Sequence, residues 1–360
     1  MAGKSRTGNF FEDFRIGMLI AHPTPRTLTD GDRSLYIALT GSRDLLGSAR
    51  TASEQAGLER QPLDGFLVFN LAFGKTVPDI SLNAVANLGY ADGRFLTPVH
   101  VGDTLRVESE IIGLRENSNG KSGVVYTRST ALNQHDQPVL TWVRWVMVRK
   151  RDPKAPAPAA EVPSLPAAVG ADALAVPGYG PGVRKIAAMT GVSDFWEDYE
   201  AGERIDHPSA MTINDSDHSS ATRLYQNTAK VHFDARMMAA TPTGRRLVYG
   251  GHVISVARAL AYDGLENVLG LLALNGGSHV APTHAGDTVC CATTVVERID
   301  LPHADVAALR LRTVAATGLD GAQQIVFPRE GAGKDDAPGV VLDLDYTVAI
   351  PRKPKTTLSP

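Results

Sequence analysis

Two kinds of hydrophobic pattern alternate along this chain. Apolar residues recur at the spacing of an amphipathic helix at Val253, Val256, Ala257 and Leu260. A similar apolar stripe is formed by Phe66, Phe69 and Phe73. Segments rich in Val and Thr, several of them alternating, predict strands at residues 104–112, 123–131, 139–148, 288–297, 307–315 and 340–350. The pattern therefore predicts one long helix followed by strands in each half of the chain.

The chain also repeats itself once. FEDFRIG at residues 11–17 resembles WEDYEAG at residues 196–202, and the match continues from His22 to His207, an offset of 185 residues. Much later, PVHVGDT at 98–104 matches PTHAGDT at 282–288, an offset of 184 residues. Two separated matches at nearly the same offset indicate a duplicated domain.

The duplication sets the expected domain boundaries and fold class. Residues 153–191 are rich in Pro and Ala, a composition typical of an extended linker. We therefore expect an N-terminal domain at 10–152 and a C-terminal domain at 192–352. One helix wrapped by an antiparallel sheet, present twice, predicts an α+β protein with a double hot-dog fold, in which pairing of the copies covers an open sheet edge. A ferredoxin-like duplication fits the same pattern.

Composition narrows the class of protein. Hydrophobic residues make up 43% of the 360 residues and charged residues 21%, as in soluble globular proteins. No apolar run reaches the roughly 20 residues that span a membrane, and the N-terminus lacks the apolar core of a signal peptide. A net charge of −3 with scattered basic residues predicts no nucleic-acid partner. The adjacent pair Cys290 and Cys291 is poorly placed for a disulfide, so we expect a reducing cytoplasm. As a separate expectation, the chain forms a homo-oligomer.

One motif carries candidate chemistry. RLYQNTAKVHFD at residues 223–234 resembles the hydratase motif of the MaoC-like dehydratase family, which has an acidic residue and then a His five residues later. The turn YGGH at residues 249–252 is similar to the His-Gly turn of that family. A closer resemblance, to the mesaconyl-CoA hydratase family, covers about residues 10–320. Its most similar stretches are 75–90, 116–121, 223–233 and 246–255.

The resemblance implies an activity. It implies a hydro-lyase that reversibly adds water to an enoyl-CoA thioester. The most specific reaction that it implies is the hydration of mesaconyl-CoA (2-methylfumaryl-CoA) to β-methylmalyl-CoA. The partner is then an acyl-CoA substrate, and no cofactor is needed, because CoA is part of the substrate. We also expect no metal, since no Cys, His or carboxylate cluster has metal-ligand spacing. The alternatives are a hydratase for another acyl chain, a thioesterase, and a non-catalytic acyl-CoA-binding protein.

The candidate catalytic residues are His232, Asn227 and Gly251. His232 is suited to move protons because its ordinary pKa lies near neutrality. Asn227 stands where the family has its acidic residue, and an amide cannot abstract a proton. Either His232 makes both proton transfers while Asn227 holds water or the thioester, or a carboxylate such as Asp234 or Asp44 takes part. The backbone N–H of Gly251, with Gly250 beside it, is the candidate donor to the thioester oxygen.

The first half of the chain lacks these candidate catalytic residues. Alignment of Leu35-Tyr36 with Leu224-Tyr225 places Ala38 opposite Asn227 and Arg43 opposite His232. We therefore expect the first half to shape the acyl-CoA groove without catalysing the reaction. Candidate substrate-binding cations, for a substrate carboxylate or a CoA phosphate, are Arg43, Lys230 and Arg223. For each of them a solvated or structural role is an equal alternative.

Overall fold

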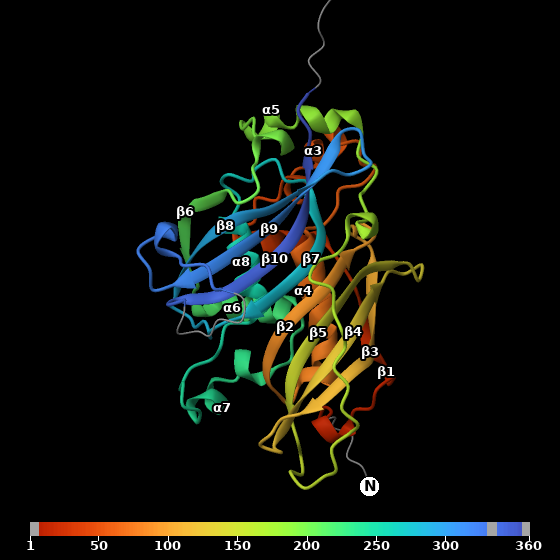
Figure 1. Cartoon of the computed structure of the whole chain (residues 1–360), viewed down its shortest axis with the longest axis vertical. Coiled ribbons are helices and arrows are strands. Elements are labelled where there is room, and N and C mark those ends of the chain that lie inside the picture. The colour runs from red at the N-terminus through yellow and green to blue at the C-terminus, as the bar shows by residue number, and fades with distance from the viewer. Residues whose placement is uncertain (1–6, 330–336, 355–360) are drawn as a thin grey trace, which may run out of the picture.

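A single antiparallel sheet organises the molecule. The computed structural model describes residues 7–329 and 337–354. Its ten strands follow the order β1-β3-β4-β5-β2-β7-β10-β9-β8-β6 (Figure 1). They are β1 Leu19–Thr27, β2 Ala84–Phe95, β3 Thr104–Glu116, β4 Ser122–Leu132, β5 Pro138–Arg149, β6 Arg204–Thr212, β7 Gly270–His279, β8 Thr288–Ile299, β9 Val306–Thr317 and β10 Val340–Pro351. The helices are α1 Asp30–Thr40, α2 Leu45–Ser48, α3 Arg50–Gln55, α4 Gly65–Thr76, α5 Ala187–Thr190, α6 Asp215–Leu224, α7 Ala235–Ala239 and α8 Gly250–Leu260.

The two halves join where β2 pairs with β7. Tyr90 of β2 lies opposite Gly277 of β7, and the strand order on one side of this seam mirrors the order on the other. The seam covers the open edge that each copy would otherwise expose, as the duplication predicts. The α+β double hot-dog fold is confirmed, and the ferredoxin-like alternative is wrong.

Hydrophobic periodicity located some strands better than others. All six predicted strands are present, as β3, β4, β5, β8, β9 and β10. The pattern did not predict the edge strands, β1 and β6, or the two seam strands, β2 and β7. Both seam strands contain glycines that weaken strand periodicity, including Gly89 and Gly93 in β2 and Gly276 and Gly277 in β7.

The two long helices pack side by side against one face of the sheet (Figure 1). In α4 every residue from Phe66 to Thr76 is buried, because the helix lies between the sheet and α8. Its aromatic stripe packs on the sheet, where the Phe69 and Trp142 rings meet edge to face at 5.8 Å. In α8 the predicted stripe is buried as well. Both helix predictions are confirmed, and the pairing brings the start of α8 against a helix from the other half.

The connection between the halves is packed, in contrast to the extended linker that its composition indicates. Residues 153–191 form only short helical turns, η3 (Ala171–Ala173), η4 (Pro181–Lys185) and α5. Val183 and Ile186 are nonetheless fully buried, in a cluster that includes Ala308 and Ala349 of the second half. The prolines limit regular structure, but the apolar residues between them still bury surface.

Candidate active site

His232 ends the short turn η6 (Lys230–His232) and is partly buried. Its Nδ1 lies 3.0 Å from the carbonyl oxygen of Leu247. Since a carbonyl only accepts, Nδ1 carries the proton, and Nε2 is left with a free lone pair. Burial, with a smaller contribution from His218, lowers the pKa of His232 to about 4 despite that hydrogen bond. The imidazole is therefore neutral at pH 7, the form that a general base requires.

Asn227 lies at the buried bend between α6 and η6. Its side-chain Oδ1 accepts a hydrogen bond from the Ala229 N–H at 2.9 Å, which shapes the loop that leads to His232. Among the described residues, its Nδ2 has no acceptor. The amide is thus held at one end and has a donor available at the other.

The start of α8 has unpaired backbone donors. Its N-cap residue, Tyr249, makes no side-chain capping bond, and no described group accepts from the N–H of Gly250 or Gly251. The first N–H groups of a helix carry partial positive charge and stabilise an oxyanion. A Cβ on Gly251 would lie 1.9 Å from Oδ1 of Asn70, so the turn needs glycine there because another helix approaches closely.

That approach comes from the first half of the chain. Asn70 of α4 donates through Nδ2 to the carbonyl of Gly251 at 3.1 Å and to Ser255 Oγ at 3.0 Å. Its Oδ1 accepts from the Tyr249 hydroxyl at 3.2 Å. Asn70 is fully buried, and it fixes the orientation of the α8 turn. Sequence reasoning missed this residue, because it belongs to the other copy of the repeat.

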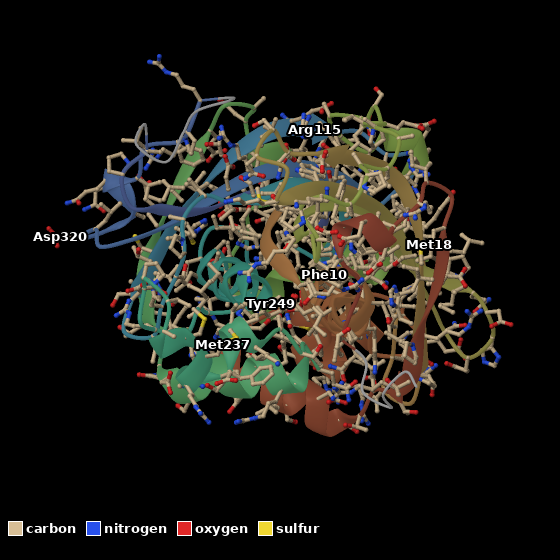
Figure 2. All side chains as sticks on the ribbon, turned by 90° about the horizontal axis from the view of Figure 1, so that it is seen from below. Phe10, Met18, Arg115, Met237, Tyr249 and Asp320 are labelled. Carbon is tan, nitrogen blue, oxygen red and sulfur yellow. The ribbon has the colours of Figure 1, made fainter. Side chains whose placement is uncertain are left out.

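Tyr249 connects the turn to the histidine. Figure 2 places Tyr249 in the middle of the molecule. Its ring meets the His232 ring at 5.5 Å and the Tyr225 ring at 5.7 Å, both edge to face. The aromatic contact links His232 to the N-cap residue of α8, which directly precedes Gly250 and Gly251.

A second histidine lies against the same turn. A Cβ on Gly250 would be 2.4 Å from the ring of His279, the last residue of β7. His279 Nε2 lies 3.1 Å from the hydroxyl of Tyr90 on the seam strand β2. Burial and the nearby His232 lower the pKa of His279 to about 4, so this ring is also neutral at pH 7. The sequence places His279 outside any motif, and only the seam brings it to Gly250.

Arg43 lies away from His232. It pairs with Asp263 at 2.9 Å and its guanidinium carbon lies 4.2 Å from the centre of the Tyr262 ring. Both partners follow the C-terminal end of α8, whereas His232 contacts the residue before its N-terminal end. The eleven residues of α8 separate these ends by roughly 16 Å. The structure therefore does not bring Arg43 together with His232.

Asp44 joins Arg43 in a separate pocket at the start of α4. Its other lining residues include Ser42, Asp64, Gly65, Arg258 and Leu271. Asp44 accepts from the Gly47 N–H at 2.8 Å as the cap of α2. Burial and the neighbouring Asp64 raise the pKa of Asp44 to about 7. The expectation that Asp44 faces the same cleft as His232 is not met, because the two line opposite ends of α8.

The remaining candidates lie near His232 in the chain. Asp234 caps α7 by accepting from the Met237 N–H at 2.9 Å, so its carboxylate has a structural partner. Lys230 and Arg223 are exposed. Arg223 donates only to Ser220 Oγ, at 3.1 Å, among the described residues. Both cations are accessible to an anionic ligand.

The fold places the chain among double hot-dog proteins of the MaoC class. A solved MaoC domain protein from Chloroflexus aurantiacus is 50% identical and superposes with a TM-score of 0.94, covering 98% of this chain and 100% of that one. A Mycobacterium tuberculosis protein described as having a double hotdog fold is 26% identical, with a TM-score of 0.75 over 96% of this chain and 99% of that one.

Sequence comparisons narrow the class. The chain is 50% identical over 98% of its length to β-methylmalyl-CoA dehydratase of Chloroflexus aurantiacus, and 51% identical over 97% to mesaconyl-CoA hydratase of Cereibacter sphaeroides. Both relatives are covered completely. The family profile described as mesaconyl-CoA hydratase matches residues 2–320. The chain belongs to the mesaconyl-CoA hydratase family, a family of hydro-lyases.

Proposed function

We propose that this chain reversibly hydrates mesaconyl-CoA to β-methylmalyl-CoA. The observation that carries the proposal is the contact of a neutral histidine, His232, with Tyr249, the N-cap of a helix whose first N–H groups have no acceptor among the described residues. Hydration of a conjugated thioester needs a base for water and donors for the enolate oxygen. The names of the relatives supply the acyl group.

The proposed reaction uses one base. His232 Nε2 takes a proton from water as the oxygen attacks the β-carbon, and electrons shift toward the thioester oxygen. The N–H of Gly251 donates to that oxygen while negative charge develops there. The imidazolium then delivers its proton to the α-carbon. Asn227 holds the water or the thioester through Nδ2. The reaction needs no redox cofactor, because addition of water is not a net oxidation or reduction.

The test is a direct assay of the purified chain. Hydration removes the ultraviolet absorbance of the conjugated thioester, and dehydration of β-methylmalyl-CoA restores it. We expect mesaconyl-CoA to react faster than crotonyl-CoA or longer enoyl-CoAs. If another enoyl-CoA reacts and mesaconyl-CoA does not, that other thioester is the substrate and the assignment of the acyl group is wrong. Binding of mesaconyl-CoA without an absorbance change would indicate a non-catalytic binder, and release of free thiol would indicate a thioesterase.

Location and assembly belong to the same proposal. A reducing cytoplasm suits Cys290 and Cys291, which are both free and buried. No helix in the described ranges is long and apolar enough to cross a membrane. Homo-oligomerisation stays a prediction, which light scattering on the purified protein tests.

A further inference from the structure

Arg144 of β5 is a buried cation without a counter-ion in the described structure. Its side chain is fully buried, and its Nη2 donates only to hydroxyls, to Thr76 Oγ1 at 2.9 Å and Ser81 Oγ at 3.3 Å. Its Nε and Nη1 have no partner among the described residues. Burial lowers the pKa of Arg144 to about 10, which still leaves it charged at pH 7. Because an uncompensated buried charge is costly, an anionic group bound at Arg144 would be stabilising.

Two routes of contact lead from Arg144 to the proposed active site. Its guanidinium carbon lies 4.2 Å from the centre of the Phe73 ring, and that ring meets Tyr249, the neighbour of His232, at 5.8 Å. On the sheet Arg144 lies opposite Tyr90, whose hydroxyl bonds to His279 beside the glycine turn. Arg144 therefore contacts Phe73 and lies opposite Tyr90, the two aromatic residues that connect it to Tyr249 and His279 in the proposed site.

The second half of the sheet has a different residue at the position that corresponds to Arg144. Arg144 lies between Tyr90 and Thr127 on its two neighbouring strands. The corresponding pair in the second sheet half is Leu274 and Leu311, each 184 residues later, and between them lies Tyr346. The Tyr346 hydroxyl is satisfied by Thr313 at 2.9 Å. Of these two positions, Arg144 has an unpaired charge and Tyr346 has a satisfied hydroxyl. The Oγ1 of Thr127, beside Arg144, also lacks a partner among the described residues.

We propose that Arg144 binds the free carboxylate of the acyl group and so selects a dicarboxylic acyl thioester. The inference rests on the proposed function. In mesaconyl-CoA this carboxylate is attached to the carbon that receives the hydroxyl group, so a group that binds it must lie next to the site of water addition. A charge-assisted hydrogen bond to a buried guanidinium supplies both affinity and orientation. Thr127 is positioned to donate to the same carboxylate.

One other buried cation competes for this role. Lys75 of α4 is buried, and its ammonium donates to Gln226 Oε1 beside Asn227. Burial, with a contribution from Arg26, lowers the pKa of Lys75 to about 8. We favour Arg144, because the Lys75 ammonium already donates to Gln226 Oε1, whereas Nε and Nη1 of Arg144 have no partner among the described residues.

The experiment compares two substrates of the same shape. Tiglyl-CoA has the skeleton and the double-bond geometry of mesaconyl-CoA, with a methyl group in place of the free carboxylate. We expect Arg144→Met to lower kcat/KM for mesaconyl-CoA about 100-fold, chiefly through KM, and to leave kcat/KM for tiglyl-CoA within about threefold. Arg144→Gln is the second variant, because its amide can still bond to Thr76. Arg128→Met on β4, where the arginine is half exposed, is the matched control and should change neither substrate.

The results separate three explanations. Failure of the wild type to hydrate mesaconyl-CoA defeats the proposed function itself. If the wild type is active but both Arg144 variants lose activity equally toward both substrates, the arginine is structural and the inference is wrong. A change of substrate preference in Lys75→Met that is absent from the Arg144 variants also overturns it. Removal of an uncompensated buried charge should leave Tm equal or higher, so a soluble Arg144 variant is expected.

Discussion

The two long helices begin in opposite ways. At α4 the carboxylate of Asp64 accepts a hydrogen bond from the Phe66 N–H at 2.8 Å. At α8 the equivalent residues, 185 positions later, are Tyr249 and Gly251, and there the N–H remains unpaired among the described groups. An N-cap carboxylate stabilises a helix, but it also places negative charge where an oxyanion would have to bind. The helix start of the first copy is therefore capped and stabilised, whereas the helix start of the second copy leaves its N–H groups available to an anionic ligand.

The largest effect should come from removing the base beside the free helix start. His232→Ala should lower kcat for hydration by about 10²- to 10⁴-fold, because no other neutral imidazole lies in the motif loop. Tm should change little, since His232 is only partly buried. Steady-state kinetics with mesaconyl-CoA measure this loss. More than half of wild-type activity in the variant would show that His232 is not the base.

Exchange of the N-cap residue of α8 tests whether the unpaired N–H groups of this helix take part in the reaction. Tyr249→Asp gives α8 the capping residue of α4, and we expect kcat/KM to fall about 10²- to 10³-fold as the carboxylate takes the N–H and repels the enolate. Tyr249→Phe is the control, since it removes only the hydroxyl that donates to Asn70. Its activity should stay within about tenfold. Full activity of a folded Tyr249→Asp variant would contradict an oxyanion role for this turn.

Asn227 sharpens the assignment of a single base. In Asn227→Asp a new carboxylate near His232 favours the imidazolium and raises the pKa of the histidine from about 4. The base form then predominates only at higher pH, so the rising limb of the kcat/KM profile moves to higher pH. Activity at pH 7 falls once the pKa of the histidine exceeds 7, because most of the imidazole is then protonated. A pH series measures this. Equal or higher activity of the variant at pH 7 would instead favour a second proton-transfer group.

The pocket at the start of α4 should influence stability and leave catalysis unchanged. The raised pKa of Asp44, about 7 in the folded chain, means that the folded state binds the proton more tightly than the unfolded state. Stability is therefore lost as pH rises from the ordinary aspartate pKa toward 7. Asp44→Asn removes this cost and should raise the free energy of unfolding by about 1 kcal/mol at pH 8, with less gain at pH 4. Chemical denaturation at both pH values checks the sign.

The smallest effect should follow Arg43→Ala. The arginine is half exposed and pairs with Asp263 on the surface, a contact worth about 0.2–1 kcal/mol. Because it lies at the far end of α8 from His232, kcat/KM for mesaconyl-CoA should change less than twofold. A large rise in KM would restore Arg43 as a substrate-binding residue.

The sequence predicted what is local and missed what crosses the seam. His232, Asn227 and Gly251 belong to two continuous motifs, and their surroundings follow from a loop and a helix start. Asn70 and Tyr90 come from the first copy, which the sequence predicts to be non-catalytic, and His279 ends a strand of weak periodicity. Their positions depend on the pairing of β2 with β7 and of α4 with α8. Such long-range packing has no signature in a single stretch of sequence.

The seam also has a consequence for how such a protein can change over time. In a dimer of identical chains, a substitution that frees one helix start frees the other as well, so each active site bears the cost of both. Fusion of the copies removes that constraint. Asp64 and Tyr249 occupy equivalent positions but are encoded separately, and Arg144 and Tyr346 likewise. One helix start can therefore be selected for rigidity while its twin is selected for chemistry, and the rigid copy supports the reactive one through Asn70.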